Sequence, residues 1–167
     1  ASIQIEDGVL VENHTISIPA TGSLQIDGNG TLNHNVSNLS IFGGNLTLNS
    51  GSTVSYGGSS TQEIFNTNYS NLTVTGAGVK NVNSNLTIPG TFNSGAQLDV
   101  TVNITFNGPV NCNGGTMNAT SGVVTYNTAA TNVIPGLYNN LTKMRGGTSM
   151  LCGDVTVSNI LDLDNGI

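Results

Sequence analysis

Apolar and polar residues alternate in short runs along most of this chain. In each run two apolar residues flank a polar one, so the apolar side chains share one face of a strand and the polar one faces away. Examples are Ile16-Ser17-Ile18, Leu24-Gln25-Ile26, Leu46-Thr47-Leu48, Leu72-Thr73-Val74, Leu86-Thr87-Ile88, Val102-Asn103-Ile104 and Val155-Thr156-Val157. Gly and Asn, which make tight turns at low cost, separate the runs. No segment of helical length has helical periodicity, so we predict an all-β chain.

One passage of the sequence occurs twice. Tyr56 and Tyr69 return as Tyr126 and Tyr138, and the strand cores around them return at offsets of 69 to 71 residues. We place the two copies at about residues 44–113 and 114–167, and residues 1–43 fit by composition alone. A fixed internal period is typical of stacked architectures. We therefore expect residues 1–167 to be one continuous segment, and a fragment of a longer repeat protein.

Two all-β architectures are compatible with these short strands. An antiparallel sandwich usually has aromatic anchors in its core, whereas this chain has no Trp and 5% aromatic residues. A parallel β-solenoid stacks its turns as well as its strands, which favours small turn residues. The sequence favours the solenoid, with roughly 20–25 residues per coil and about three coils in each 70-residue unit.

The composition narrows the possible partners. The chain has 25 Asn, 21 Thr, 16 Ser and 22 Gly, but 7% charged residues and a net charge of −6. Three cationic residues cannot replace the counterions of a nucleic acid, and an anionic membrane surface would repel the chain. No apolar run is long enough for a membrane-spanning helix. We therefore expect no nucleic-acid partner and no membrane span.

The wording of the first copy resembles a known family. Tyr69-x-Asn71-Leu72-Thr73-Val74-x-Gly76-x-Gly78-x-Lys80, followed by Asn85-Leu86-Thr87-Ile88 and Gly95-Ala96-Gln97-Leu98-Asp99, is similar to β-solenoid repeats of large Bacteroidota cell-surface adhesins, including gliding-motility adhesins. The match covers residues 44–100 well and residues 114–166 loosely, because Lys143-Met144-Arg145 departs from the pattern. The resemblance implies type IX secretion, an extracellular location at the cell surface, and a recognition domain elsewhere in the parent chain.

The histidines and cysteines are candidate ligands or cross-links. His14 and His34 lie about one coil apart, but two imidazoles without nearby carboxylates make a poor metal site, so we expect exposed or turn histidines. Cys112 and Cys152 lie at positions that the alternation turns inward, and 40 residues is about two coils. Two coils, at about 4.8 Å each, exceed the Cα separation of a disulfide. We therefore expect two buried free thiols.

No catalytic, cofactor or metal site follows from the remaining polar residues. Asp162 and Asp164 have a faint calcium-loop pattern without the bidentate Glu of an EF-hand, and the first copy has Thr91-Phe92-Asn93 in this place, which argues for a turn. Lys80, Lys143 and Arg145 have no acidic cluster near them in sequence. We also find no nucleophile elbow and no carboxylate pair for glycoside hydrolysis. The sequence therefore predicts a protein that is not an enzyme and uses no cofactor.

Surface-binding functions remain as alternatives. The tyrosines could form glycan platforms, although their repeated spacing fits a structural role better. Outward threonines such as Thr47, Thr87 and Thr156 could bind ordered water, but paired threonines as in Thr73-Val74-Thr75 are too rare for a regular array. The eleven Asn-x-Ser/Thr sequons are expected to be bare strand and turn residues. They begin at Asn13, Asn29, Asn35, Asn38, Asn45, Asn68, Asn71, Asn85, Asn103, Asn118 and Asn140.

The leading hypothesis is a non-catalytic stalk or filament body in a secreted surface adhesin. Its expected partners are neighbouring repeats of the same chain, with secretion or cell-surface machinery and surface glycans as further candidates. Backbone hydrogen bonds between coils and an inner stack of aliphatic side chains would let such a rod grow without a larger core. A glycan-binding or ice-binding solenoid module is the alternative.

Overall fold

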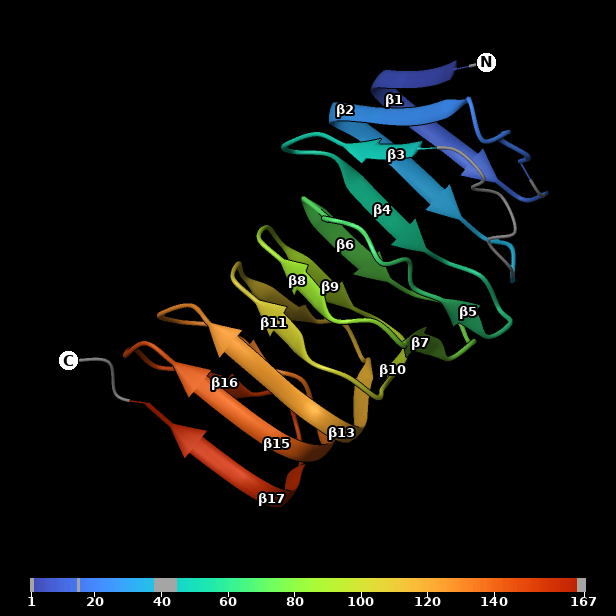
Figure 1. Ribbon diagram of the computed structural model, residues 1–167. Helices are drawn as coiled ribbons and strands as arrows, with labels where there is room; N and C mark the ends of the chain where they lie inside the picture. The colour runs from blue at the N-terminus through green and yellow to red at the C-terminus, as the bar shows by residue number, and fades with distance from the viewer. Residues whose placement is uncertain (1, 15, 38–44, 165–167) are drawn as a thin grey trace.

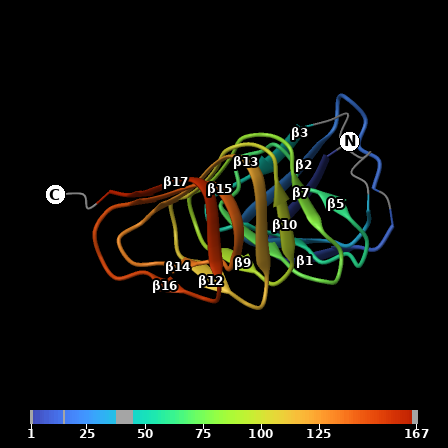
Figure 2. The same ribbon diagram turned by 90° about the horizontal axis from the view of Figure 1, so that it is seen from below.

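The computed structural model is a parallel β-solenoid of about eight coils, as the sequence predicts. It describes residues 2–14, 16–37 and 45–164. Figure 1 shows the coils stacked from the N-terminal end to the C-terminal end, and Figure 2 shows the coils from below. Every strand pairing in the described part of the chain is parallel. The described residues include no helix that could span a membrane.

Seventeen strands are present in the described residues. Those of the first half are β1 (Ser2–Glu12), β2 (Ser23–His34), β3 (Asn45–Leu48), β4 (Thr53–Tyr56), β5 (Gln62–Glu63), β6 (Asn71–Val74), β7 (Lys80–Val82), β8 (Leu86–Ile88) and β9 (Phe92–Ser94). Those of the second half are β10 (Gln97–Val100), β11 (Ile104–Phe106), β12 (Val110–Cys112), β13 (Thr116–Asn127), β14 (Asn132–Val133), β15 (Gly136–Met144), β16 (Met150–Leu151) and β17 (Val155–Leu163).

The strands form three parallel ladders that run along the solenoid. The first ladder contains the second halves of β1 and β2, followed by β4, β6, β9 and β12, and the pair β14-β16 continues it. The first half of β2 pairs with β3 instead. The second contains β5, β7 and β10, followed by the first halves of β13, β15 and β17. The third contains β8 and β11, followed by the second halves of the same three long strands. Each long strand therefore bends at a register shift and serves two ladders.

The coil length varies with position along the chain. Paired residues are 22 apart near the N-terminus, as in Ser23 with Asn45, and 18 apart in the middle, as in Leu86 with Ile104. The shortest step, of 17 residues, joins Val123 to Asn140. The coils are thus slightly shorter than the predicted length, because most corners are tight turns of a few residues.

The register between neighbouring strands of each ladder explains how the core is packed. Leu32, Val54, Leu72, Phe92 and Val110 form one inward column of the first ladder, and each is at most 2% exposed. Equivalent columns line the other two ladders, so each apolar side chain packs on the one below it and the one above it. Burial of this kind is the main stabilising term of a fold whose coils contact only their neighbours.

The two copies of the repeat lie on different ladders. Tyr56 ends β4 in the first ladder, where it pairs with Val74, whereas Tyr126 lies in the third ladder, where it pairs with Phe106. From β4 the chain passes β6, β9 and β12, which are three complete coils, and then crosses the second ladder to reach Tyr126. The repeat therefore advances by three coils and two further ladders, rather than by a whole number of coils.

Candidate functional site

The candidate residues gather at the corners between ladders, where the backbone hydrogen bonding is interrupted. Two buried tyrosine pairs are the clearest case. The Tyr56 and Tyr69 hydroxyls are 2.7 Å apart, and the Tyr126 and Tyr138 hydroxyls are 2.9 Å apart. All four side chains are at most 1% exposed. They cannot offer an aromatic face to a glycan, so a glycan platform built on these tyrosines is not present.

Each tyrosine pair holds one peptide segment of an inward-turned corner. The Tyr56 hydroxyl accepts a hydrogen bond from the Phe65 N–H at 3.1 Å, and the Tyr69 hydroxyl donates to the Phe65 carbonyl at 3.1 Å. In the second copy the Ile134 N–H donates to Tyr126 at 3.2 Å and the Ile134 carbonyl accepts from Tyr138 at 2.5 Å. The repeated tyrosines thus satisfy backbone groups at these buried corners.

Lysine side chains serve the same corner in both copies. Lys80 is fully buried, and its Nζ donates to the Gly58 carbonyl at 2.8 Å. Lys143 Nζ donates to the Thr128 carbonyl at 2.6 Å, and residue 128 is the repeat counterpart of residue 58. Burial lowers the pKa of both lysines. Neither lysine has an ion pair among the described residues, which fits a backbone-capping role better than proton abstraction.

His34 contradicts the prediction of exposed or turn histidines, whereas His14 is exposed as expected. The His34 ring is fully buried, and its Nδ1 lies 2.6 Å from Glu12 Oε2. Apolar and polar residues alternate along both strands, so Glu12 points inward with Leu10, and His34 points inward with Leu32. The sequence pattern could therefore have identified Glu12 as a buried residue. That it pairs with His34 follows from the register of β1 on β2. No cluster of three metal-ligand side chains is present in the described residues.

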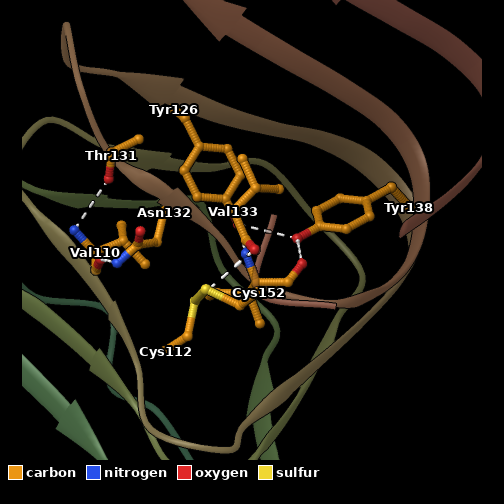
Figure 3. The surroundings of a disulfide bond; sticks show 9 residues. Val110, Cys112, Tyr126, Thr131, Asn132, Val133, Tyr138 and Cys152 are labelled. Atoms are coloured by element: carbon orange, nitrogen blue, oxygen red, sulfur yellow. Dashed lines mark hydrogen bonds between the residues drawn. A yellow bond between two sulfur atoms is a disulfide. The ribbon is translucent and has the colours of Figure 1, made fainter. Parts of the chain in front are cut away.

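The cysteines also contradict the prediction, because Cys112 and Cys152 form a disulfide. Their Cα atoms are 6.3 Å apart, although the residues belong to coils two steps apart. β14 lies between them but ends at Val133, which Figure 3 shows beside the disulfide. The next residue, Ile134, is fully buried, and its N–H donates to the Tyr126 hydroxyl. The intervening coil therefore leaves a gap that the disulfide spans. Cys112 is half-buried and Cys152 is exposed, so neither is a buried thiol.

Several of the sequons are Asn-apolar-Thr triplets with a structural role that the sequence did not predict. Asn71, Asn85 and Asn103 each accept a backbone N–H of the next coil on Oδ1, from Thr91, Asn103 and Val123 respectively. Asn71 Nδ2 also donates to the Gly51 carbonyl of the preceding coil at 3.1 Å. In each triplet the apolar residue then points inward and the Thr outward. Recurrent Asn-apolar-Thr at strand starts was the signal that could have shown this.

The threonines of the triplets that begin at Asn85, Asn103 and Asn140 share one outward column, whereas Thr73 pairs with Ser55 and Asn93 in the first ladder. Thr87, Thr105, Thr125 and Thr142 are register partners on β8, β11, β13 and β15. Asp162 of β17 follows Thr142 in this column. Asp162 lies within a strand, and Asn165 and Gly166 of the calcium-loop pattern lie outside the described residues.

Comparison with known proteins adds no family. No protein-family model matches the chain, and no curated protein or solved structure matches it.

Alkaline pH is expected to unfold the protein through its buried tyrosines. Burial raises the pKa of Tyr126 to about 12 and also raises those of Tyr56, Tyr69 and Tyr138. Unfolded tyrosine loses its proton near pH 10, so the stability is complete below about pH 10 and is lost as the pH rises toward the folded pKa values. Each buried tyrosine lowers the stability by about 1.4 kcal/mol per pH unit in this window.

Absorbance of tyrosinate and circular dichroism, recorded together from pH 8 upward, test this expectation. The lowered pKa values of Lys80 and Lys143 act in the opposite direction, but only up to about pH 10.5, where unfolded lysine loses its proton, so the tyrosines dominate above that pH. Ionisation and loss of β structure should occur in one shared transition. Gradual ionisation of the tyrosines with the fold intact would contradict their burial.

Loss of the disulfide is expected to destabilise the C-terminal coils. Replacing Cys112 and Cys152 by Ser removes a cross-link that closes a loop of 40 residues, which costs about 2–4 kcal/mol. Thermal unfolding of the double Ser variant should show a lower Tm than that of the wild type, and a reductant should lower only the wild-type Tm. Equal Tm values, or free thiols detected in the air-oxidised wild type, would show that the bond does not form.

Proposed function

We propose that this chain is a non-catalytic structural segment, a stalk or filament body, of a secreted cell-surface adhesin. The observation that carries the proposal is where the exposed large hydrophobic side chains lie. All those found in the described residues belong to the first strand or the last three strands: Ile3, Val9, Val11, Leu137, Met144, Met150, Leu151, Ile160, Leu161 and Leu163. The coils between them have polar sides. Ile3, Leu161 and Leu163 continue inward columns, because they pair with Leu24, Leu141 and Lys143, and uncovered inward residues at both ends support end-to-end joining of a rod.

The inter-coil contacts support a role in spanning distance. Backbone ladders, aliphatic columns and side-chain bridges such as Asn111 to Asn93 all run along the axis of the solenoid, from one coil to the next. Each coil contacts its neighbours, so coils can be added without enlarging the core. A polar and weakly charged coat limits salt-dependent association of the sides.

The disulfide supports the proposed location. Disulfides persist in oxidising compartments and on cell surfaces, and are rare in the reducing cytosol. Cys152 is exposed, so a reducing compartment would have access to this bond. The adhesin class itself, with export by a type IX system, rests on the resemblance of residues 44–100, and the expected partners are neighbouring coils of the same array.

Removal of one complete coil tests the structural role. Leu86 to Asn103 is an 18-residue coil, because Lys80, Leu86 and Phe92 each pair with the residue 18 positions later. Its deletion joins Asn85 to Ile104 and keeps every ladder in register. The variant should fold, and its length in small-angle X-ray scattering should fall by about 5 Å, the spacing of adjacent strands.

Deletion of Leu86–Ser94 is the matched control. This change removes half a coil, so the apolar columns of one ladder would meet the next ladder, and the protein should unfold. Equal tolerance of the two deletions, or collapse of the full-coil variant, would contradict modular stacking of coils and the spacer function that depends on it.

A second candidate function, binding of ordered water or ice, is favoured by one observation. The column Thr87, Thr105, Thr125 and Thr142 presents hydroxyls on four successive coils of one ladder. If this face binds ice, Thr105→Lys and Thr125→Lys should abolish thermal hysteresis and inhibition of ice recrystallisation. Thr156→Lys, which is exposed on the second ladder, should leave both unchanged. Absence of thermal hysteresis in the wild type would remove this candidate.

A further inference from the structure

The C-terminal end of the solenoid carries an apolar cleft beside an open strand edge. In the described residues β17 pairs with β15 alone. The cleft, of about 520 Å³, is lined by Leu141, Val155, Val157, Leu161 and Leu163, with Leu151 and Lys143 at its margin. Leu161 and Leu163 are 55% and 62% exposed. A strand with an unpaired edge can pair with a further strand, and apolar residues that would otherwise face the core can then pack on that added strand.

The internal repeat shows what covers this surface. Leu72 and Leu141 are repeat counterparts, and they pair with Phe92 and Leu161, so the strand register places Leu161 where Phe92 lies, instead of Leu163 as the sequence comparison has it. In the same way Val155 and Val157 correspond to Leu86 and Ile88. The first-copy residues are at most 4% exposed, whereas Leu161 is 55% exposed.

The covering residues in the first copy belong to the next coil. Ile104 pairs with Leu86, Phe106 pairs with Ile88, and Val110 pairs with Phe92, all in parallel. The segment from Ile104 to Val110 is therefore the molecule's own example of the strand that fits this surface. It contains two apolar residues separated by Thr105, then the turn Asn107-Gly108-Pro109, and then one more apolar residue.

We propose that the β17 edge and its cleft are a docking site for an extended segment with this chemistry, which adds as a parallel strand. In the bound state the residues of the added segment that correspond to Ile104 and Phe106 lie over Val155 and Val157. The residue that corresponds to Val110 lies over Leu161. The backbone of the added segment completes the ladder on β17. This inference rests on the proposed structural function and specifies the partner through which a rod is extended.

A peptide of residues Val102–Asn111, labelled for fluorescence anisotropy, tests the site on the complete chain. It should bind saturably, and hydrogen exchange should slow at the amides of Val155–Leu163. A peptide with Asn in place of Ile104 and Phe106 should not bind. Leu161→Lys should weaken binding by at least about tenfold, since the buried leucine contact is lost. Val9→Lys is the matched control at the other end, because Val9 is also exposed, and it should leave affinity unchanged.

Absence of saturable binding would overturn the proposal. Equal affinity for the Leu161→Lys variant, or slowed exchange at β1 instead of β17, would do so as well. A dimer of the wild-type chain that both Leu161→Lys and Val9→Lys disperse would also overturn it, because the N-terminal strand of a second copy would then be the occupant. Failure here leaves the coil-deletion result untouched, so loss of the docking site can be told from loss of the structural function.

Discussion

The constraint that governs this structure is that every coil must satisfy the backbone groups of the coil beside it. Within the ladders, parallel strands do so directly. At the corners the strands diverge, and side chains take over: Asn71 bridges two coils, Lys80 binds a carbonyl, and Tyr138 binds the Ile134 peptide. The high Asn content of the chain follows from this requirement, because an amide both donates and accepts.

The same requirement separates polar groups that are structural from polar groups that are available to a ligand. Of the side chains that would attract attention in a catalytic search, the lysines and tyrosines are held by backbone or by one another, and His34 is held by Glu12. What the sides expose is short, polar and repetitive. The end coils differ, since their apolar columns stop without a covering strand in the described residues, and this contrast is the basis for regarding length as the property that the molecule provides.

The ladders and the core could be predicted from the sequence, whereas the corners could not. Alternation such as Leu72-Thr73-Val74 fixes which side chains point inward, and the repeat indicates stacking, so the solenoid and the structural character of Tyr56 and Tyr126 follow. The disulfide depended on the path of one corner, where Ile134 turns inward and removes the strand that would have separated the two cysteines. The Glu12–His34 contact needed the register of β1 on β2, which composition and periodicity do not determine.

The fractional advance of the repeat has a geometrical consequence. Since Tyr56 lies on the first ladder and Tyr126 on the third, one unit is related to the next by a screw operation that turns it by two of the three faces of the rod. Three units would restore the starting orientation. A surface patch that belongs to the unit would therefore follow a helical path around the rod. Repeating the unit cannot place that patch in a continuous line along one side. An array of this kind would present the same unit on each of its three faces in turn, so none of the faces would be distinguished from the others.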